Sequence, residues 1–162
     1  EYPPVAVVAL GFWRDDVDHP LDGFGMLIPA VERRRILGTI FSSSLFEGRA
    51  PENSVLLTTF VGGARQPLMA SLGDDALVED VRSDLRDLLG VNGEPVFRRI
   101  YRWPRAIPQY GADYGEILAA LEGLEAREPG LHFAGNYRGG ISAGQCIHNG
   151  LQLAAGISPV QP

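Results

Sequence analysis

Apolar positions in the first 61 residues fall in short runs, and polar or glycine-containing connections separate these runs. Each run has the length of a β-strand, and four of them follow one another closely, which predicts an antiparallel sheet. The first run is apolar at every position, as expected of a strand that is buried on both faces. The predicted strands are residues 5–10, 24–28, 36–42 and 54–61. Phe24 and Met26 on the second strand are assigned to the core.

A helical period replaces this pattern after residue 73. Apolar residues then recur every three or four positions, which predicts an amphipathic helix. Asp74 or Asp75 is the expected N-cap, and Gly90 stands where a C-terminal cap belongs. The apolar positions of this helix are Leu77, Val81, Leu85 and Leu88.

In the last 70 residues, strand-like apolar runs alternate with segments of helical period. Residues 95–102 are rich in Val, Phe, Ile and Tyr and predict a fifth strand, and residues 114–124 predict a second amphipathic helix that ends before Pro129. Residues 131–134 then predict a short buried strand. A glycine-containing turn and a third helix, over about residues 141–155, complete the chain.

Strand, glycine-rich turn and helix together form a unit that directs free backbone N–H groups and the positive end of a helix dipole at a ligand. The turn, residues 135–140, lacks the Lys and Ser/Thr of a P-loop and the spacing of a dinucleotide fingerprint. On the residues alone, an ordinary turn that requires small side chains explains the pattern better than a ligand site does.

Composition narrows the function. The net charge of −6 argues against a nucleic-acid partner, which requires a basic face. The single Cys146 excludes an internal disulfide and indicates a reducing setting, which we expect to be cytoplasmic, with peripheral membrane association left open. Three His and one Cys are too scattered for a metal site, and no apolar run reaches the roughly 20 residues of a transmembrane segment.

Four segments in order resemble the flavin-dependent amine oxidase superfamily. Within it the segments are most similar to the protoporphyrinogen oxidases, the FAD enzymes of haem synthesis. The segments are Gly23-Phe-Gly-Met-Leu-Ile-Pro29, Leu37-Gly-Thr-Ile-Phe-Ser-Ser-Ser44, Trp103-Pro-Arg-Ala-Ile-Pro-Gln-Tyr110 and the glycine-rich turn from Gly135. Since no N-terminal Gly-x-Gly-x-x-Gly unit is present, the resemblance implies the C-terminal portion of a longer enzyme, inactive by itself.

The resemblance implies an α+β fold in two parts. Residues 1–102 are expected to form an antiparallel, substrate-domain-like sheet with a covering helix. Residues 103–162 are expected to supply the C-terminal strand and helix of an FAD-binding domain. The residues implied to contact FAD are Trp103, Gly135, Asn136, Gly140, Ile141, Ser142 and Ala143.

The roles within this set differ. Gly135 and Asn136 would let the backbone approach the ribityl and phosphate region. The amides of residues 141–143 would face the N1–C2=O edge of the ring, where partial positive charge stabilises reduced flavin. Trp103 would lie against the flavin, although a partly buried core Trp explains it as well. No catalytic acid or base can be named.

The implied substrate is a porphyrinogen, with molecular oxygen as the acceptor. Arg side chains near the strands are candidates for binding its carboxylates. Two other functions remain open: an amine oxidase or carotenoid desaturase of the same superfamily, and a non-enzymatic binding module. Residues 5–10 and 103–110 are expected to expose apolar surface, so we also expect self-association.

Overall fold

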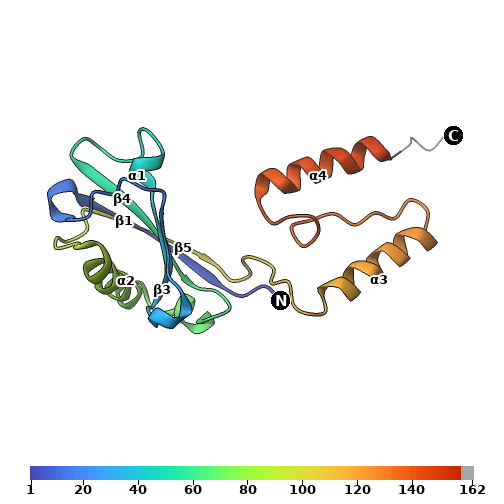
Figure 1. Cartoon of the computed structure of the whole chain (residues 1–162), viewed down its shortest axis with the longest axis horizontal. Coiled ribbons are helices and arrows are strands. Elements are labelled where there is room, and N and C mark those ends of the chain that lie inside the picture. Colours follow the sequence, from blue (N-terminus) through green and yellow to red (C-terminus); the bar gives the residue numbers. More distant parts are fainter. Residues whose placement is uncertain (158–162) are drawn as a thin grey trace. The chain divides into compact units, whose positions relative to one another are not determined.

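The computed structural model describes residues 1–157 of the chain (Figure 1). These residues divide into two compact units. Residues 3–106 form the sheet unit, and residues 1–2 with the chain from Ile107 onward form the C-terminal unit.

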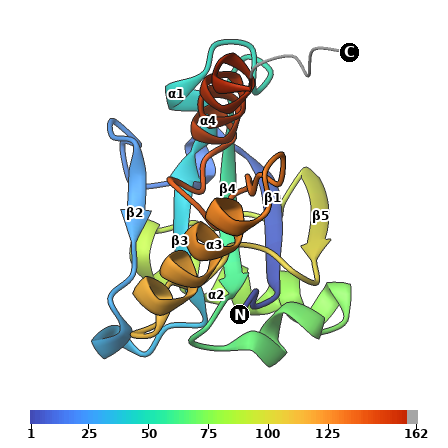
Figure 2. The ribbon, with the colours of Figure 1, turned by 90° about the vertical axis from the view of Figure 1, so that its right-hand side faces the viewer.

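The sheet unit is built on five antiparallel strands in the order β2-β3-β4-β1-β5, seen side by side in Figure 2. The predicted antiparallel sheet is therefore confirmed. The strands are β1 (Val5–Trp13), β2 (Gly25–Leu27), β3 (Ile36–Phe41), β4 (Ser54–Gly62) and β5 (Phe97–Trp103). Short helical segments connect them: η1 (Arg14–Asp16), η2 (Ala30–Glu32), α1 (Ser42–Leu45) and η3 (Pro67–Ser71).

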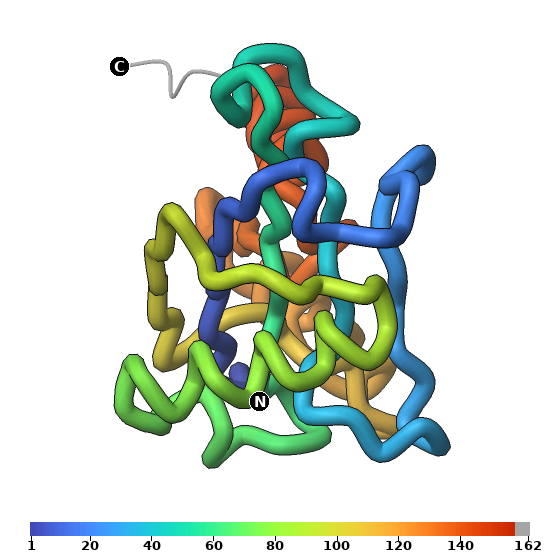
Figure 3. Tube along the Cα trace, turned by 90° about the vertical axis from the view of Figure 1, so that its left-hand side faces the viewer, coloured from blue at the N-terminus to red at the C-terminus, as the bar shows by residue number. Residues whose placement is uncertain are grey.

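Helix α2 (Asp74–Leu89) covers one face of this sheet (Figure 3). Alternate residues of β1 point at it and are fully buried, among them Val8 and Leu10, because successive strand residues face opposite sides of a sheet. The intervening residues Val7 and Ala9 are only half-buried. The expectation that β1 is buried on both faces is therefore wrong, since only one face of the sheet is covered within this unit.

The ends of α2 follow the sequence only in part. Gly90 adopts the left-handed conformation (φ 63°, ψ 42°) and its N–H bonds to the Arg86 carbonyl, which confirms the predicted C-terminal cap. The N-cap is Gly73, not Asp74 or Asp75, and no side chain accepts a capping hydrogen bond there. The carboxylates of Asp74 and Asp75 lie in the first turn instead, where the positive end of the helix dipole stabilises their negative charge.

A buried carboxylate ties α2 to β3. Asp84 Oδ2 accepts hydrogen bonds from the backbone N–H of Arg35 (2.7 Å) and of Ile36 (3.0 Å). The Arg34 guanidinium lies 3.6 Å from Asp84 Oδ1. Asp84 is 5% exposed, so these donors replace the water that its charge would otherwise require.

The second face of the sheet, which we call the open face, carries large side chains that α2 does not cover. On β5 these are Phe97, Tyr101 and Trp103, each about half exposed, and Phe60 of β4 belongs to the same face. Phe24 lies just before β2, where it is 68% exposed and lines an apolar pocket of about 290 Å³ with Met26 and Phe60. Its assignment to the core is wrong, whereas Met26 does pack against the core.

Self-association is the first testable prediction. Strand β5 is at an edge of the sheet, so one side of its backbone has no strand partner among residues 1–157. The same strand carries three exposed aromatic residues. We expect the 162-residue chain to form a dimer through this edge, and Tyr101→Lys to shift it to a monomer, while Glu79→Lys on α2 does not. Light scattering after gel filtration measures the mass, and a monomer at high concentration contradicts the prediction.

The C-terminal unit contains α3 (Tyr114–Arg127) and α4 (Ala143–Gly156), and no residue of either helix is buried. Residues 131–134 do not form the predicted strand. A strand requires a partner for its backbone groups, and no strand among residues 1–157 pairs with this segment. The glycine-containing turn and the following helix agree with the sequence. None of the helices among these residues is long and apolar enough to cross a bilayer.

Candidate functional site

The glycine-containing loop leads directly into α4, and its backbone explains the choice of residues. Gly139 (φ 77°) and Gly140 (φ 131°) adopt conformations that other residues rarely accept. A Cβ on Gly140 would stand 2.3 Å from Gln145 Cγ, and one on Gly139 would stand 2.7 Å from Asn149 Nδ2. Both glycines are therefore needed for the loop to lie against the first turns of α4.

The start of α4 presents backbone donors. Ser142 is the N-cap, and its hydroxyl accepts a hydrogen bond from the Gln145 N–H at 3.1 Å. Within residues 1–157 the amides of Ala143 and Gly144 have no hydrogen-bond acceptor. Ile141 beside them is 44% exposed. These amides and the helix dipole offer partial positive charge to a negatively polarised ligand edge.

Asn136 is held by aromatic hydroxyl groups. The Tyr2 hydroxyl donates to Asn136 Oδ1 at 3.2 Å, and the Tyr110 hydroxyl donates to the Asn136 carbonyl at 3.1 Å. Tyr110 also stacks on Tyr114, with 4.3 Å between ring centroids. Partial desolvation, reinforced by Tyr114, raises the pKa of Tyr110, so its hydroxyl stays protonated as the donor. The Asn136 amide is thereby fixed on one side of the loop.

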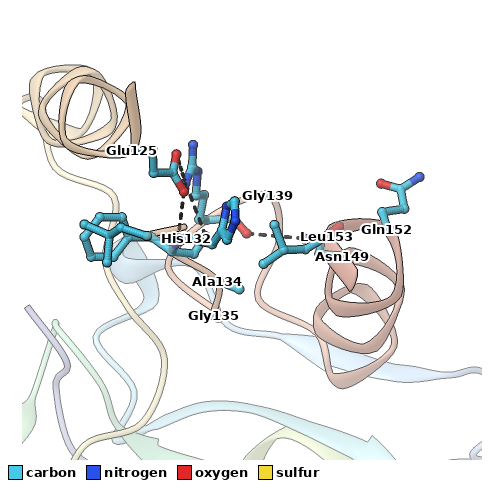
Figure 4. A pocket seen from close by; sticks show the side chains of 11 residues that line it. Glu125, His132, Ala134, Gly135, Gly139, Asn149, Gln152 and Leu153 are labelled. Carbon is cyan, nitrogen blue, oxygen red and sulfur yellow. Dashed lines mark hydrogen bonds and ion pairs between the residues drawn. The ribbon is translucent and has the colours of Figure 1, made fainter. Parts of the chain in front are cut away.

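An ion pair crosses the base of the loop (Figure 4). Glu125, near the end of α3, accepts hydrogen bonds at Oε1 from the Phe133 N–H and from Arg138 Nη1, both at 2.8 Å. These three residues line a pocket of about 530 Å³, together with His132, Gly135 and residues of α4. The backbone bond from Phe133, followed by the bond from Arg138, holds the pKa of Glu125 below its ordinary value.

The lowered pKa of Glu125 gives a pH prediction. A carboxyl whose pKa is depressed on folding contributes stability above its ordinary value of 4.5, and this contribution is lost as the pH falls through the lowered value. We expect Arg138→Met to raise the Glu125 midpoint part of the way toward 4.5, because the Phe133 bond remains. A carbon-detected NMR titration of the side chain measures the midpoint. An unchanged midpoint would show that Arg138 has no influence.

The remaining predicted contact, Trp103, belongs to the sheet unit. It ends β5 opposite Val5, is 55% exposed and lines a pocket of about 270 Å³ with Pro4, Ala70 and Pro104. It is not the core Trp of the alternative interpretation. The other six predicted residues lie together in the loop and at the first residue of α4: Gly135, Asn136, Gly140, Ile141, Ser142 and Ala143.

Sequence reasoning missed the side chains that hold this loop. Glu125, Tyr2 and Asn149 all contact it, but they come from segments 8 or more residues away from their partners. No spacing or motif marks them, since each looks like an ordinary surface residue of its own element. From the sequence, Pro108–Tyr110 either lines the site or forms a structural turn, and nothing there indicates the hydrogen bond from Tyr110 to Asn136.

The site fits the isoalloxazine edge of a flavin in the chemistry of its donors. Backbone amides at the N-terminus of α4 that have no acceptor within residues 1–157 suit the negatively polarised edge of such a ring. Residues 1–157 contain no group of His, Cys, Asp or Glu arranged to hold a metal ion.

Comparison with known proteins defines the class. Residues 1–158 match the family model described as flavin containing amine oxidoreductase, so the chain belongs to this family. It is a homologue of the protoporphyrinogen oxidases in particular: the mitochondrial protoporphyrinogen oxidase of Nicotiana tabacum is 44% identical over 157 residues. That match covers 95% of this chain and 31% of the relative, so the chain spans about a third of the relative's length.

Two further similarities agree with this family assignment. The coproporphyrinogen III oxidase of Bacillus subtilis is 30% identical over 147 residues, covering 90% of this chain and 31% of the relative. A crystal structure of a provisionally assigned protoporphyrinogen oxidase from Exiguobacterium sp. superposes with a TM-score of 0.76 at 22% identity, over 95% of this chain and 34% of that one. The second match supports the fold. The predicted resemblance is thus confirmed.

Proposed function

We propose that this chain is the C-terminal portion of an FAD-dependent oxidoreductase that oxidises protoporphyrinogen to protoporphyrin in haem biosynthesis. The observation that carries the proposal is the 44% identity to the tobacco protoporphyrinogen oxidase over nearly the whole chain. When bound, FAD would supply the hydride-accepting chemistry, with molecular oxygen as the expected final acceptor. The residues of this chain bind and orient the two molecules.

The two units have different parts in this proposal. The sheet unit is the substrate-domain-like part, and the C-terminal unit completes an FAD-binding domain. The absence of buried residues in α3 and α4 supports the second assignment, since helices of an FAD-binding domain require further elements to cover them.

Flavin contacts are assigned to the loop and the start of α4. Gly135, Gly140 and the Asn136 amide would hold the cofactor, and the amides of Ile141, Ser142 and Ala143 would supply partial positive charge to its N1–C2=O edge. Ala143 is the first residue of the helix, so positive potential acts there on the charge that the ring gains on reduction. Trp103 is assigned to the flavin from the sheet unit.

The open face is proposed as the wall for the porphyrinogen, a broad apolar disc with carboxylates at its rim. Phe24, Leu27, Ile40 and Phe60 line the apolar pocket on this side. Four arginines near the sheet are already engaged in ion pairs with aspartates of α2: Arg34, Arg35, Arg98 and Arg102.

Arg99 differs from these residues. It is opposite Ala9 on the open face and lies over the Tyr101 ring at 5.5 Å. We expect Arg99→Ala in the full-length enzyme to raise KM for protoporphyrinogen about tenfold, as for loss of one charged hydrogen bond, with kcat changed less. Arg98→Ala is the matched control, because the adjacent Arg98 faces α2 and binds Asp75. Equal KM values for the two variants would contradict the role of Arg99.

Steady-state kinetics test the proposal as a whole. The full-length enzyme should turn over protoporphyrinogen faster than benzylamine and than a polyamine. Coproporphyrinogen is included because the Bacillus relative is named for it. Faster turnover of either amine would overturn the porphyrinogen assignment and favour an amine oxidase of the same family.

A further inference from the structure

The loop from Phe133 to Gly140 has few bonds of its own, and side chains of α3 set its shape. Within the loop, the Arg138 N–H bonds to the Gly135 carbonyl at 3.1 Å. The stronger connections come from Glu125, whose two carboxylate oxygens lie 2.8 and 2.9 Å from Arg138 Nη1. The same Nη1 is 3.2 Å from the Phe133 carbonyl. One carboxylate and one guanidinium thus join the start of the loop to its middle.

Helix α4 holds the other side of the loop. Asn149 Nδ2 donates to the Arg138 carbonyl at 3.3 Å, and Asn149 Oδ1 accepts from Gln145 Nε2 at 2.9 Å. Gln145 and Asn149 are also the side chains beside which Gly140 and Gly139 pack. Arg138 is therefore fixed through its side chain by α3 and through its backbone by α4.

The ion pair between Glu125 and Arg138 is partly shielded from solvent, which strengthens its hold on the loop. The side chains of Glu125 and Arg138 are only 20% and 25% exposed, so water competes less for their charges than at an open surface. Glu125 also accepts the Phe133 N–H, which has no backbone acceptor within residues 1–157. Several charge-assisted bonds at one carboxylate define its geometry more closely than a single ion pair does.

We propose that Glu125 and Arg138 are positioning residues that hold the loop of residues 133–140 in its flavin-binding shape before the cofactor arrives. Neither residue touches the cofactor in this proposal; both act through the loop backbone. A loop that is already ordered loses less conformational entropy on binding, so its preorganisation appears directly as cofactor affinity. The cofactor identity rests on the proposed function above, whereas the effect on the loop does not.

Hydrogen exchange of the flavin-free full-length enzyme tests the structural half. In Glu125→Gln, the amides of Phe133 and Arg138 should exchange about tenfold faster, the change expected for loss of one charged hydrogen bond. Glu122→Gln is the matched control, since Glu122 is on the same helix but lies 3.9 Å from Arg138 Nη2 and is 67% exposed. Equal exchange in the two variants would overturn the proposal.

Cofactor affinity tests the other half in the full-length enzyme. Glu125→Gln and Arg138→Lys should each raise the Kd for FAD about tenfold, while KM for the substrate stays unchanged in flavin-saturated enzyme. Glu125→Asp should recover part of the affinity. A merely structural role would speed exchange but leave Kd unchanged, and that result overturns the proposal. If affinity falls as expected but no porphyrinogen is oxidised, the proposed function fails while the positioning role stands.

Discussion

Asp84→Ala should lower the free energy of unfolding of the chain by about 3 kcal/mol. The substitution leaves the N–H groups of Arg35 and Ile36 without their acceptor at the start of β3. It also removes the carboxylate from the guanidinium of Arg34. Urea denaturation monitored by tryptophan fluorescence measures the change.

Asp87→Ala is the control for this prediction. Asp87 is also on α2 and also pairs with Arg34, but its side chain is 52% exposed and accepts no backbone N–H. An exposed ion pair contributes about 0–1 kcal/mol, so a small change is expected. If Asp87→Ala lowered the free energy of unfolding as much as Asp84→Ala, the stabilisation would come from the negative charge near Arg34 and not from the acceptor for the Arg35 and Ile36 amides.

Gly140→Val should abolish flavin retention in the full-length enzyme. The left-handed φ of 131° and the 2.3 Å separation from Gln145 Cγ leave no room for a Cβ, so the loop must move away from α4. Flavin content per protein, from the visible spectrum, is expected to fall more than about tenfold, which corresponds to more than about 1.4 kcal/mol of binding.

Gly123→Ala serves as the comparison for Gly140→Val. Gly123 is inside α3, where an added Cβ meets no atom within 4 Å, and Ala has the higher helix propensity. Flavin content should be unchanged and the helix slightly more stable. Normal flavin content and turnover in Gly140→Val would show that this loop does not approach the cofactor.

Much of the sheet unit was predictable because local pattern and tertiary packing agree there. The run Ser54–Gly62 has the length of a strand, and the period of Leu77, Val81 and Leu85 places these three residues on the buried side of the helix. Gly90 was recognisable because few other residues adopt its left-handed conformation. Patterns that depend only on the chain's own periodicity were therefore sufficient for the antiparallel sheet and its helix.

The predictions that were wrong share one physical cause: each depends on which neighbouring segment pairs with or covers the residues concerned. Residues 131–134 have a strand-like composition, but no neighbouring strand among residues 1–157 satisfies their backbone. Phe24 is apolar but exposed, because composition does not reveal which face of a sheet is covered. An N-cap depends on backbone angles rather than on the nearest Asp, which is why Gly73 is the N-cap of α2.

The candidate site shows the same division. The loop glycines were predictable, since Gly139 and Gly140 report local backbone requirements. Glu125 was not, because its importance arises only when α3 brings it to Phe133 and Arg138. Side chains that position a loop carry no sequence signature of their own, so a structure is needed to find them.

Anaerobic titration of the flavin-loaded, full-length enzyme tests the central claim most directly. Visible flavin absorption is recorded while protoporphyrinogen is added, and in a parallel sample while benzylamine is added. The account predicts that protoporphyrinogen removes the absorption and that benzylamine leaves it unchanged over the same time. Absorption that disappears with benzylamine and persists with protoporphyrinogen, or purified enzyme without any flavin absorption, would contradict it.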